Sequence, residues 1–86
     1  MHEASLMNDL ISKIEAILDE QDAERVVSVS VTLGALSHMS PDHFSDHFES
    51  AAIGKRMEGA RLDIDLMDDI HHPMAQDILL DSIEVE

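Results

Sequence analysis

The chain has 86 residues, 44% of them apolar, and a formal net charge of −14. A chain of this length forms one domain with a thin core, and its strong acidity disfavours nucleic acid and anionic membranes as partners, because like charges repel. The sequence contains no cysteine, which excludes a disulfide, a thiolate nucleophile and a cysteine zinc site.

The same sequence gives no sign of secretion, membrane insertion or catalysis. The amino-terminal stretch is acidic and amphipathic, unlike a signal peptide, and no apolar run approaches the roughly 20 residues of a membrane span. A nucleophile motif and a glycine-rich phosphate loop are both missing. We therefore expect a cytoplasmic protein that is not an enzyme.

The first predicted element is a helix that ends near Glu20. Ser5 is a candidate N-cap, with Asp9 in the expected first turn. Apolar residues then recur at helical spacing and define one buried face. They are Leu6, Met7, Leu10, Ile11, Ile14, Ile17 and Leu18.

Residues 25–36 change to a period of two, which predicts a strand with one wet face. The apolar residues Val27, Val29, Val31 and Leu33 alternate with small polar ones. Gly34, near the end of this strand, indicates a bend or the close approach of another backbone segment.

A second helix is predicted from Ser40, which is a candidate N-cap followed by a proline at the first helical position. Its apolar side carries Phe44, Phe48, Ala51 and Ala52. We expect the helix to end near Gly54 in a left-handed cap, and a further turn at Gly59.

Two more strands are predicted at residues 61–66 and 77–86. In the first, Leu62, Ile64 and Leu66 alternate with charged residues; in the second, we expect Leu79, Ile83 and Val85 on one face. The element order predicts an α+β two-layer sandwich, in which a three-stranded sheet carries two helices on one face. We expect the last two strands to pair as an antiparallel hairpin.

The start of the chain combines groups that can chelate a divalent metal. The Met1 amine, a backbone amide and the His2 imidazole lie within a few bonds of one another. Nitrogen donors suit Ni(II) and Cu(II), especially in a planar arrangement with deprotonated amides. We expect Met1 to be retained, because the aminopeptidases that remove it need a small second residue.

Histidines elsewhere are weaker candidates. His43 and His47 are four residues apart on the predicted second helix, so both imidazoles can face the same way. Such pairs can bind zinc or nickel, but two ligands rarely hold a metal alone. We interpret them as a polar helix face beside the two phenylalanines.

Three further histidines lie in predicted loops. His38 is in a connector that can approach the amino terminus, where it would offer a fourth ligand. His71 and His72 are close to Asp68 and Asp69, but adjacent residues in a loop define no coordination geometry. We interpret this segment as a solvated turn.

Five segments, in order along the chain, carry a family resemblance. They are Met1-His2-Glu3-Ala4-Ser5-Leu6, Leu33-Gly34-Ala35-Leu36-Ser37, Phe48-Glu49, Gly59-Ala60-Arg61-Leu62-Asp63-Ile64 and Ser82-Ile83-Glu84-Val85-Glu86. In these segments the chain resembles the HypA/HybF family, the nickel metallochaperones of hydrogenase maturation, which in some bacteria also serve urease.

The resemblance implies a transient Ni(II) site at the amino terminus. Its ligands would be the Met1 amine and amide, the His2 imidazole and the Glu3 backbone, with the Glu3 carboxylate as a neighbour. The implied function is delivery of Ni(II) to a nickel enzyme such as [NiFe]-hydrogenase. The implied partners are a maturation GTPase and the large subunit of the metalloenzyme, and a homodimer is also open.

One departure from the family pattern is large. The family inserts a zinc-binding lobe with two CxxC pairs before the last strand, whereas this chain has a short loop near residues 67–76. We expect a single domain over residues 1–86 that binds nickel and no zinc. The alternative is a divergent paralog without zinc that acts as a protein-interaction or regulatory module and delivers no metal.

Overall fold

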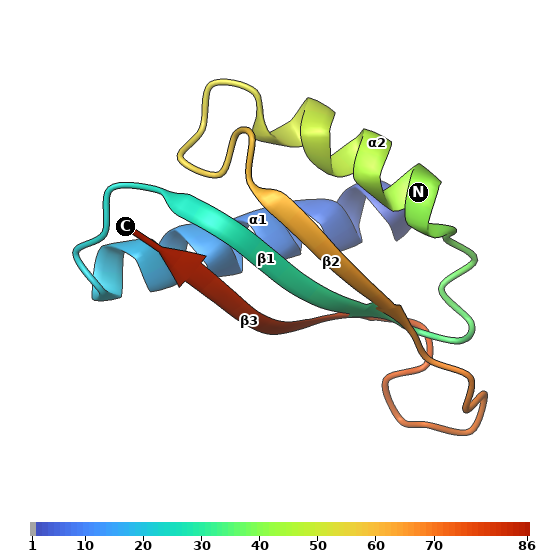
Figure 1. Cartoon of the computed structure of the whole chain (residues 1–86). Coiled ribbons are helices and arrows are strands. Elements are labelled where there is room, and N and C mark those ends of the chain that lie inside the picture. Colours follow the sequence, from blue (N-terminus) through green and yellow to red (C-terminus); the bar gives the residue numbers. More distant parts are fainter. Residues whose placement is uncertain (1) are drawn as a thin grey trace.

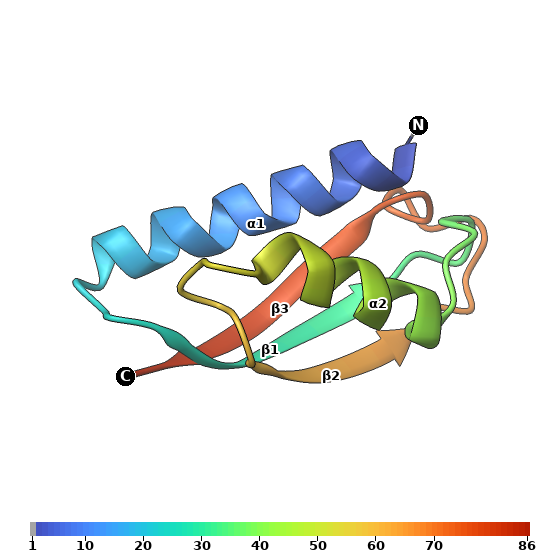
Figure 2. The ribbon, with the colours of Figure 1, turned by 90° about the horizontal axis from the view of Figure 1, so that it is seen from above.

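The computed structural model describes residues 2–86, and the side chains of residues 4–86. Its elements are α1 (His2–Glu20), β1 (Val26–Leu33), α2 (Pro41–Ala52), β2 (Arg61–Leu66) and β3 (Ile78–Val85). Both helices cover the same face of a three-stranded sheet (Figures 1 and 2). The predicted two-layer α+β sandwich is therefore confirmed.

Helix α1 begins three residues before the predicted cap. It runs from His2 to Glu20, so Ser5 lies inside the helix as an exposed residue and is not the N-cap. Glu3 and Ala4 are both good helix formers, which allows the helix to extend through them. A cap at Ser5 would have placed residues 2–4 ahead of the helix, and this was wrong, since His2 and Glu3 belong to its first turn.

Strand β1 lies in the centre of the sheet, parallel to β2 and antiparallel to β3. The expected hairpin of the last two strands was wrong, because β1 separates them, although they do run in opposite directions. Valine is β-branched and suits a buried, pleated surface, and β1 carries four valines without a charged residue. The flanking strands carry the charged residues, which suit sheet edges.

Two irregularities in the pairing of β1 with β3 change which side chains face the helices. Val26 pairs with Val85 and Ser28 with Glu84, so Val27 is an extra residue. Val27 is consequently 44% exposed whereas Val26 is 3% exposed. This corrects the predicted burial of Val27, because a β-bulge reverses the alternation on one side of it.

The second irregularity lies in β3 itself. Ser30 pairs with Ser82 and Val31 with Leu80, which makes Asp81 the extra residue. Ile78 and Leu80 therefore join Ile83 against the helices. Of the three residues expected to share one face, Ile83 packs against the helices, whereas Leu79 and Val85 do not.

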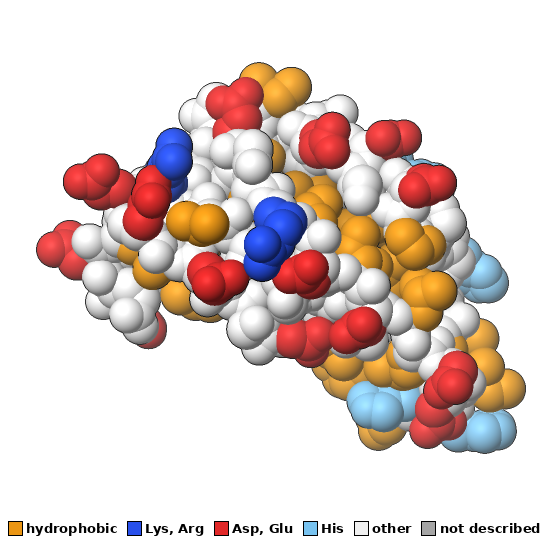
Figure 3. Space-filling model, in the orientation of Figure 1, with side chains coloured by type: hydrophobic (Ala, Val, Ile, Leu, Met, Phe, Trp, Pro, Cys, Tyr) orange, Lys and Arg blue, Asp and Glu red, His pale blue; other side chains and the backbone are white. Residues whose placement is uncertain are grey.

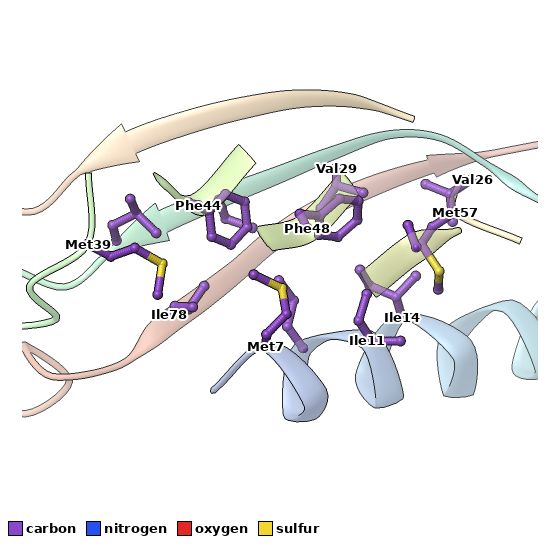
Figure 4. Packing of buried hydrophobic residues seen from close by; sticks show 14 of the residues in the cluster. Met7, Ile11, Ile14, Val26, Val29, Met39, Phe44, Phe48, Met57 and Ile78 are labelled. Carbon is purple, nitrogen blue, oxygen red and sulfur yellow. The ribbon is translucent and has the colours of Figure 1, made fainter. Parts of the chain in front are cut away.

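The core lies between the helices and the inner face of the sheet (Figure 4). Phe44 and Phe48 of α2 stack with ring centroids 5.9 Å apart and are 0% and 2% exposed. Their fully buried neighbours include Ile14, Leu18, Val29, Val31, Leu33 and Met57. The apolar faces predicted for both helices are the faces that pack.

The start of α2 follows the predicted chemistry, whereas its end differs in detail. The Ser40 side chain accepts a hydrogen bond from the backbone N–H of His43, and a proline begins the helix. Gly54 and Gly59 both have φ of +78°, a conformation that glycine adopts without steric cost. The positive φ predicted at Gly54 is observed, but it belongs to a turn closed by the Lys55 N–H on the Ala52 carbonyl, because the C-cap residue Ile53 has φ of −56° and ψ of 126°. The turn predicted at Gly59 is confirmed.

The loop between β2 and β3 passes over the end of β1. The backbone N–H of Met67 donates to the Leu33 carbonyl at 2.9 Å, and that of Leu36 donates to the Ala75 carbonyl at 2.7 Å. Gly34 lies between these bonds and contacts the loop backbone directly. The close backbone approach predicted at Gly34 is confirmed.

Candidate metal-binding site

The predicted nickel ligands lie at the edge of the described part of the chain. Met1 is outside the described residues, and so are the side chains of His2 and Glu3. The backbone of His2 and Glu3 forms the first turn of α1. The first four N–H groups of an α-helix have no acceptor within the helix, so helix formation leaves these two amide nitrogens available.

A surface hollow of about 540 Å³ lies beside this first turn. Ala4, Met7 and Asn8 of α1 line one side of it. The other side belongs to α2 and is formed by Asp46, His47, Ser50 and Ala51. The start of α1 is therefore next to α2, and α1 lies behind the sheet in the view of Figure 1.

A second hollow connects α1 with the two loops at this end of the sheet. Ser5 and Leu6 line it together with His38 from the β1–α2 loop and Gln76 from the β2–β3 loop. The predicted approach of the His38 connector to the first turns of α1 is therefore observed. His38 is exposed and has φ of +59°; its role as a ligand stays a prediction.

His43 and His47 converge more closely than their spacing alone requires. Their Nε2 atoms lie 3.0 Å apart, and their ring centroids are separated by 4.6 Å with the planes tilted by 46°. His43 is half-buried and His47 is exposed. The spacing of four residues was visible in the sequence, but the rotamers that bring the two Nε2 atoms into contact were not.

His71 and His72 belong to a hydrogen-bonded turn in the β2–β3 loop. The His71 backbone N–H donates to Asp69 Oδ1 at 2.9 Å, and His72 Nδ1 accepts from the backbone N–H of Met74 at 2.9 Å. Nδ1 of His72 is thus engaged in a hydrogen bond within the turn. Over the part of the chain whose side chains are described, no three His, Asp or Glu side chains come together as a metal site.

Acidic side chains are spread over the surface seen in Figure 3. Arg56 pairs with Asp19 at 2.8 Å, and Arg61 lies 3.5 Å from Glu84 on the sheet face. The chain has 19 acidic residues against five basic ones. Such an excess attracts divalent cations to the whole molecule, but it gives no selectivity among them.

Within residues 2–86, neither helix combines the length and the apolar character that crossing a bilayer requires.

Comparison with known proteins gives a consistent result. The profile of a family described as "Hydrogenase/urease nickel incorporation, metallochaperone, hypA" matches residues 1–71. This description names a carrier of nickel and no catalytic activity.

Curated relatives carry the same description of role. The hydrogenase maturation factor HypA of Methylocella silvestris is 39% identical over 67 residues, which cover 78% of this chain and 59% of that protein. The HypA protein of Desulfitobacterium hafniense is 36% identical with the same two coverages. HypA 1 of Bradyrhizobium diazoefficiens is 38% identical over 64 residues, or 74% of this chain and 57% of that protein. The matched part therefore spans less than two thirds of each of these relatives.

Proposed function

Because the chain belongs to the HypA family of hydrogenase/urease nickel-incorporation maturation factors, we propose that it binds Ni(II) at its amino terminus and delivers the ion to a nickel enzyme such as [NiFe]-hydrogenase. The proposed ligands are the Met1 amine and amide, the His2 imidazole and the Glu3 backbone, with the Glu3 carboxylate beside them. Nickel is here the cargo of the protein. No catalytic step is assigned to the chain.

The observation that carries this proposal is the match of the family profile from residue 1 onward. It includes the His2 and Glu3 positions, which supply the nitrogen donors that Ni(II) prefers. The helical start of α1 supports it further, since the amides of the first turn are not consumed by helix hydrogen bonds.

The electrostatics of this position favour a site that releases its ion. The amino-terminal end of a helix is the positive end of its dipole, which opposes a bound cation by about 0.3–1 kcal/mol. The negative charge of the molecule as a whole acts in the opposite direction. A metal held by a few nitrogen donors under these opposing influences suits transfer better than storage.

We propose further that residues 1–86 act as one nickel-binding domain, in which the short loop near residues 67–76 replaces the zinc lobe of the family. By the same family relationship, the proposed partners are a maturation GTPase and the large subunit of the metalloenzyme. Self-association as a homodimer belongs to the same proposal. The proposed location is the cytoplasm.

One observation favours the alternative of an interaction module without metal delivery. Leu66, Ile70 and Met74 are 62%, 55% and 41% exposed in or beside the β2–β3 loop. In Figure 3 hydrophobic, acidic and His side chains gather at this end of the molecule. Exposed apolar groups in a cluster are typical of protein contact surfaces, and they require no metal.

Calorimetric titration with Ni(II) separates the two functions. The proposal predicts that untagged protein binds nickel and that His2→Ala weakens binding at this site by at least about tenfold. Loss of a residue that only hydrogen-bonds to a metal ligand already lowers metal affinity about 10–100-fold. His71→Ala is the matched control, because it removes an exposed imidazole far along the chain. Equal affinities of all three proteins for nickel would favour the interaction module.

A further inference from the structure

We propose that His43 and His47 form a second metal site, in which both Nε2 atoms coordinate one divalent transition-metal ion. This site lies on α2, and neither of its two histidines is among the ligands proposed for the amino-terminal chelate. It follows from the positions of the two rings and goes beyond the function proposed above.

The separation of the two Nε2 atoms fits simultaneous coordination. Metal–nitrogen bonds to histidine are about 2.0–2.1 Å long, so two cis nitrogens lie about 2.9 Å apart at a right angle and about 3.4 Å apart at a tetrahedral angle. The observed separation of Nε2 in His43 from Nε2 in His47 is 3.0 Å. A metal ion could therefore enter between the rings with only small side-chain adjustments.

The helix holds the two rings in this relationship. Residues four apart lie on the same face of a helix, and α2 is anchored directly below them by the buried rings of Phe44 and Phe48. His43 is itself half-buried, which restricts its side chain. Little conformational freedom remains to be lost when the metal binds, and this favours chelation.

The charge around the pair also favours a cation. Helix α2 contains Asp42, Asp46 and Glu49 and has no lysine or arginine. Imidazole nitrogens select ions such as Ni(II), Cu(II) and Zn(II) over Mg(II) and Ca(II), which prefer oxygen. The carboxylates raise the local concentration of divalent cations, and the two imidazoles provide the selectivity.

Metal binding competes with the contact that the rings make in the metal-free protein. At 3.0 Å one ring donates an N–H from Nε2 to the Nε2 lone pair of the other. For both Nε2 lone pairs to reach the metal, the donating ring shifts its proton to Nδ1 through solvent.

Among the residues whose side chains are described, no third His, Asp or Glu completes the site. His47 also lines the hollow that borders Ala4, which places the pair close to the first turn of α1.

The test uses the full chain with an amino-terminal extension and His2→Ala, so that the proposed amino-terminal chelate is disabled. Calorimetric titration with Ni(II) should still detect one ion per chain. His43→Gln and His47→Gln should each weaken this binding by more than about tenfold, because losing a residue that merely hydrogen-bonds to a metal ligand already lowers metal affinity about 10–100-fold. Glutamine retains a hydrogen-bonding group for the remaining histidine, so far-UV circular dichroism should be unchanged.

The control is the pair of variants His71→Gln and His72→Gln, which should leave nickel affinity the same. Imidazole nitrogen NMR during titration with diamagnetic Zn(II) gives an independent readout, in which Nε2 of both His43 and His47 should shift together. Equal nickel affinity in the His43→Gln and His47→Gln variants, or a zinc-induced shift of only one ring, would reduce the contact to a structural hydrogen bond. Because the amino-terminal chelate is disabled throughout, either result is independent of the proposed delivery function.

Discussion

A Cβ atom on Gly34 would lie 2.2 Å from the carbonyl oxygen of Ala75. It would also lie 2.7 Å from the carbonyl oxygen of Asp77, which accepts a hydrogen bond from the Gly34 N–H at 2.9 Å. Both obstacles are backbone atoms, which cannot rotate away as a flexible side chain can. The β2–β3 loop therefore closes over β1 only because residue 34 has no side chain.

Gly34→Ala should destabilise the protein by about 1–3 kcal/mol or more, the usual cost of forcing extra volume into a packed site. The measurement is the free energy of unfolding from urea denaturation followed by circular dichroism. Ser12→Ala, at an exposed position of α1, is the control and should change stability by less than about 0.5 kcal/mol. An unchanged midpoint for Gly34→Ala would mean that the loop moves freely away from β1.

Ser40→Ala should weaken the start of α2. The Ser40 hydroxyl oxygen accepts from the His43 backbone N–H at 3.1 Å, and loss of such a cap costs about 0.5–2 kcal/mol. Ser40→Asp should retain most of the stability, because aspartate caps equally well. Thermal unfolding of the three proteins measures the difference, and equal melting temperatures would show that the cap contributes nothing.

The sequence was most informative where a single element decides the outcome. Helical spacing in α1, the Ser40 cap and the glycines at 34, 54 and 59 could all be read locally, because each depends on neighbouring residues. The two-layer sandwich was also predictable, because each helix has a single apolar face and must pack it against the sheet.

Features that depend on pairing between distant segments were not predictable. The extra residues Val27 and Asp81 become bulges only once β3 is paired with β1. The order of the strands likewise depends on the path of the β2–β3 loop over the end of β1. For the candidate sites, the spacing of His43 and His47 was readable, whereas their convergence at Nε2 required side-chain rotamers.

The fold should be independent of metal. The core consists of apolar side chains from both helices and all three strands, and the chain has no cysteine to form a structural zinc site. Far-UV circular dichroism and the melting temperature should therefore be the same before and after dialysis against a strong chelator. A loss of helical signal in chelator would reveal a structural metal.

Nickel affinity should fall as the pH is lowered. A coordinating imidazole or amine must be deprotonated, so protons compete with Ni(II) for the His2 and Met1 nitrogens, and the complex loses stability from about pH 8 towards about pH 5. Ligation by deprotonated backbone amides would make the decline steeper. Titrations at a series of pH values test this, and an affinity that stays flat over the range would indicate carboxylate ligands instead.

The central claim is that the Met1 amine and His2 together hold the nickel ion. An extension fused ahead of Met1 converts the amine to an amide and removes its lone pair, while His2 remains present. Helix α1 should be unaffected, since its anchors Met7, Leu10 and Ile14 lie further along the chain. The direct measurement is the visible absorption and magnetism of the nickel complex in the extended and unextended proteins. The account predicts a weakly absorbing, diamagnetic planar Ni(II) complex only in the unextended protein. The same spectrum and stoichiometry in both proteins would contradict it and move the site to the other histidines.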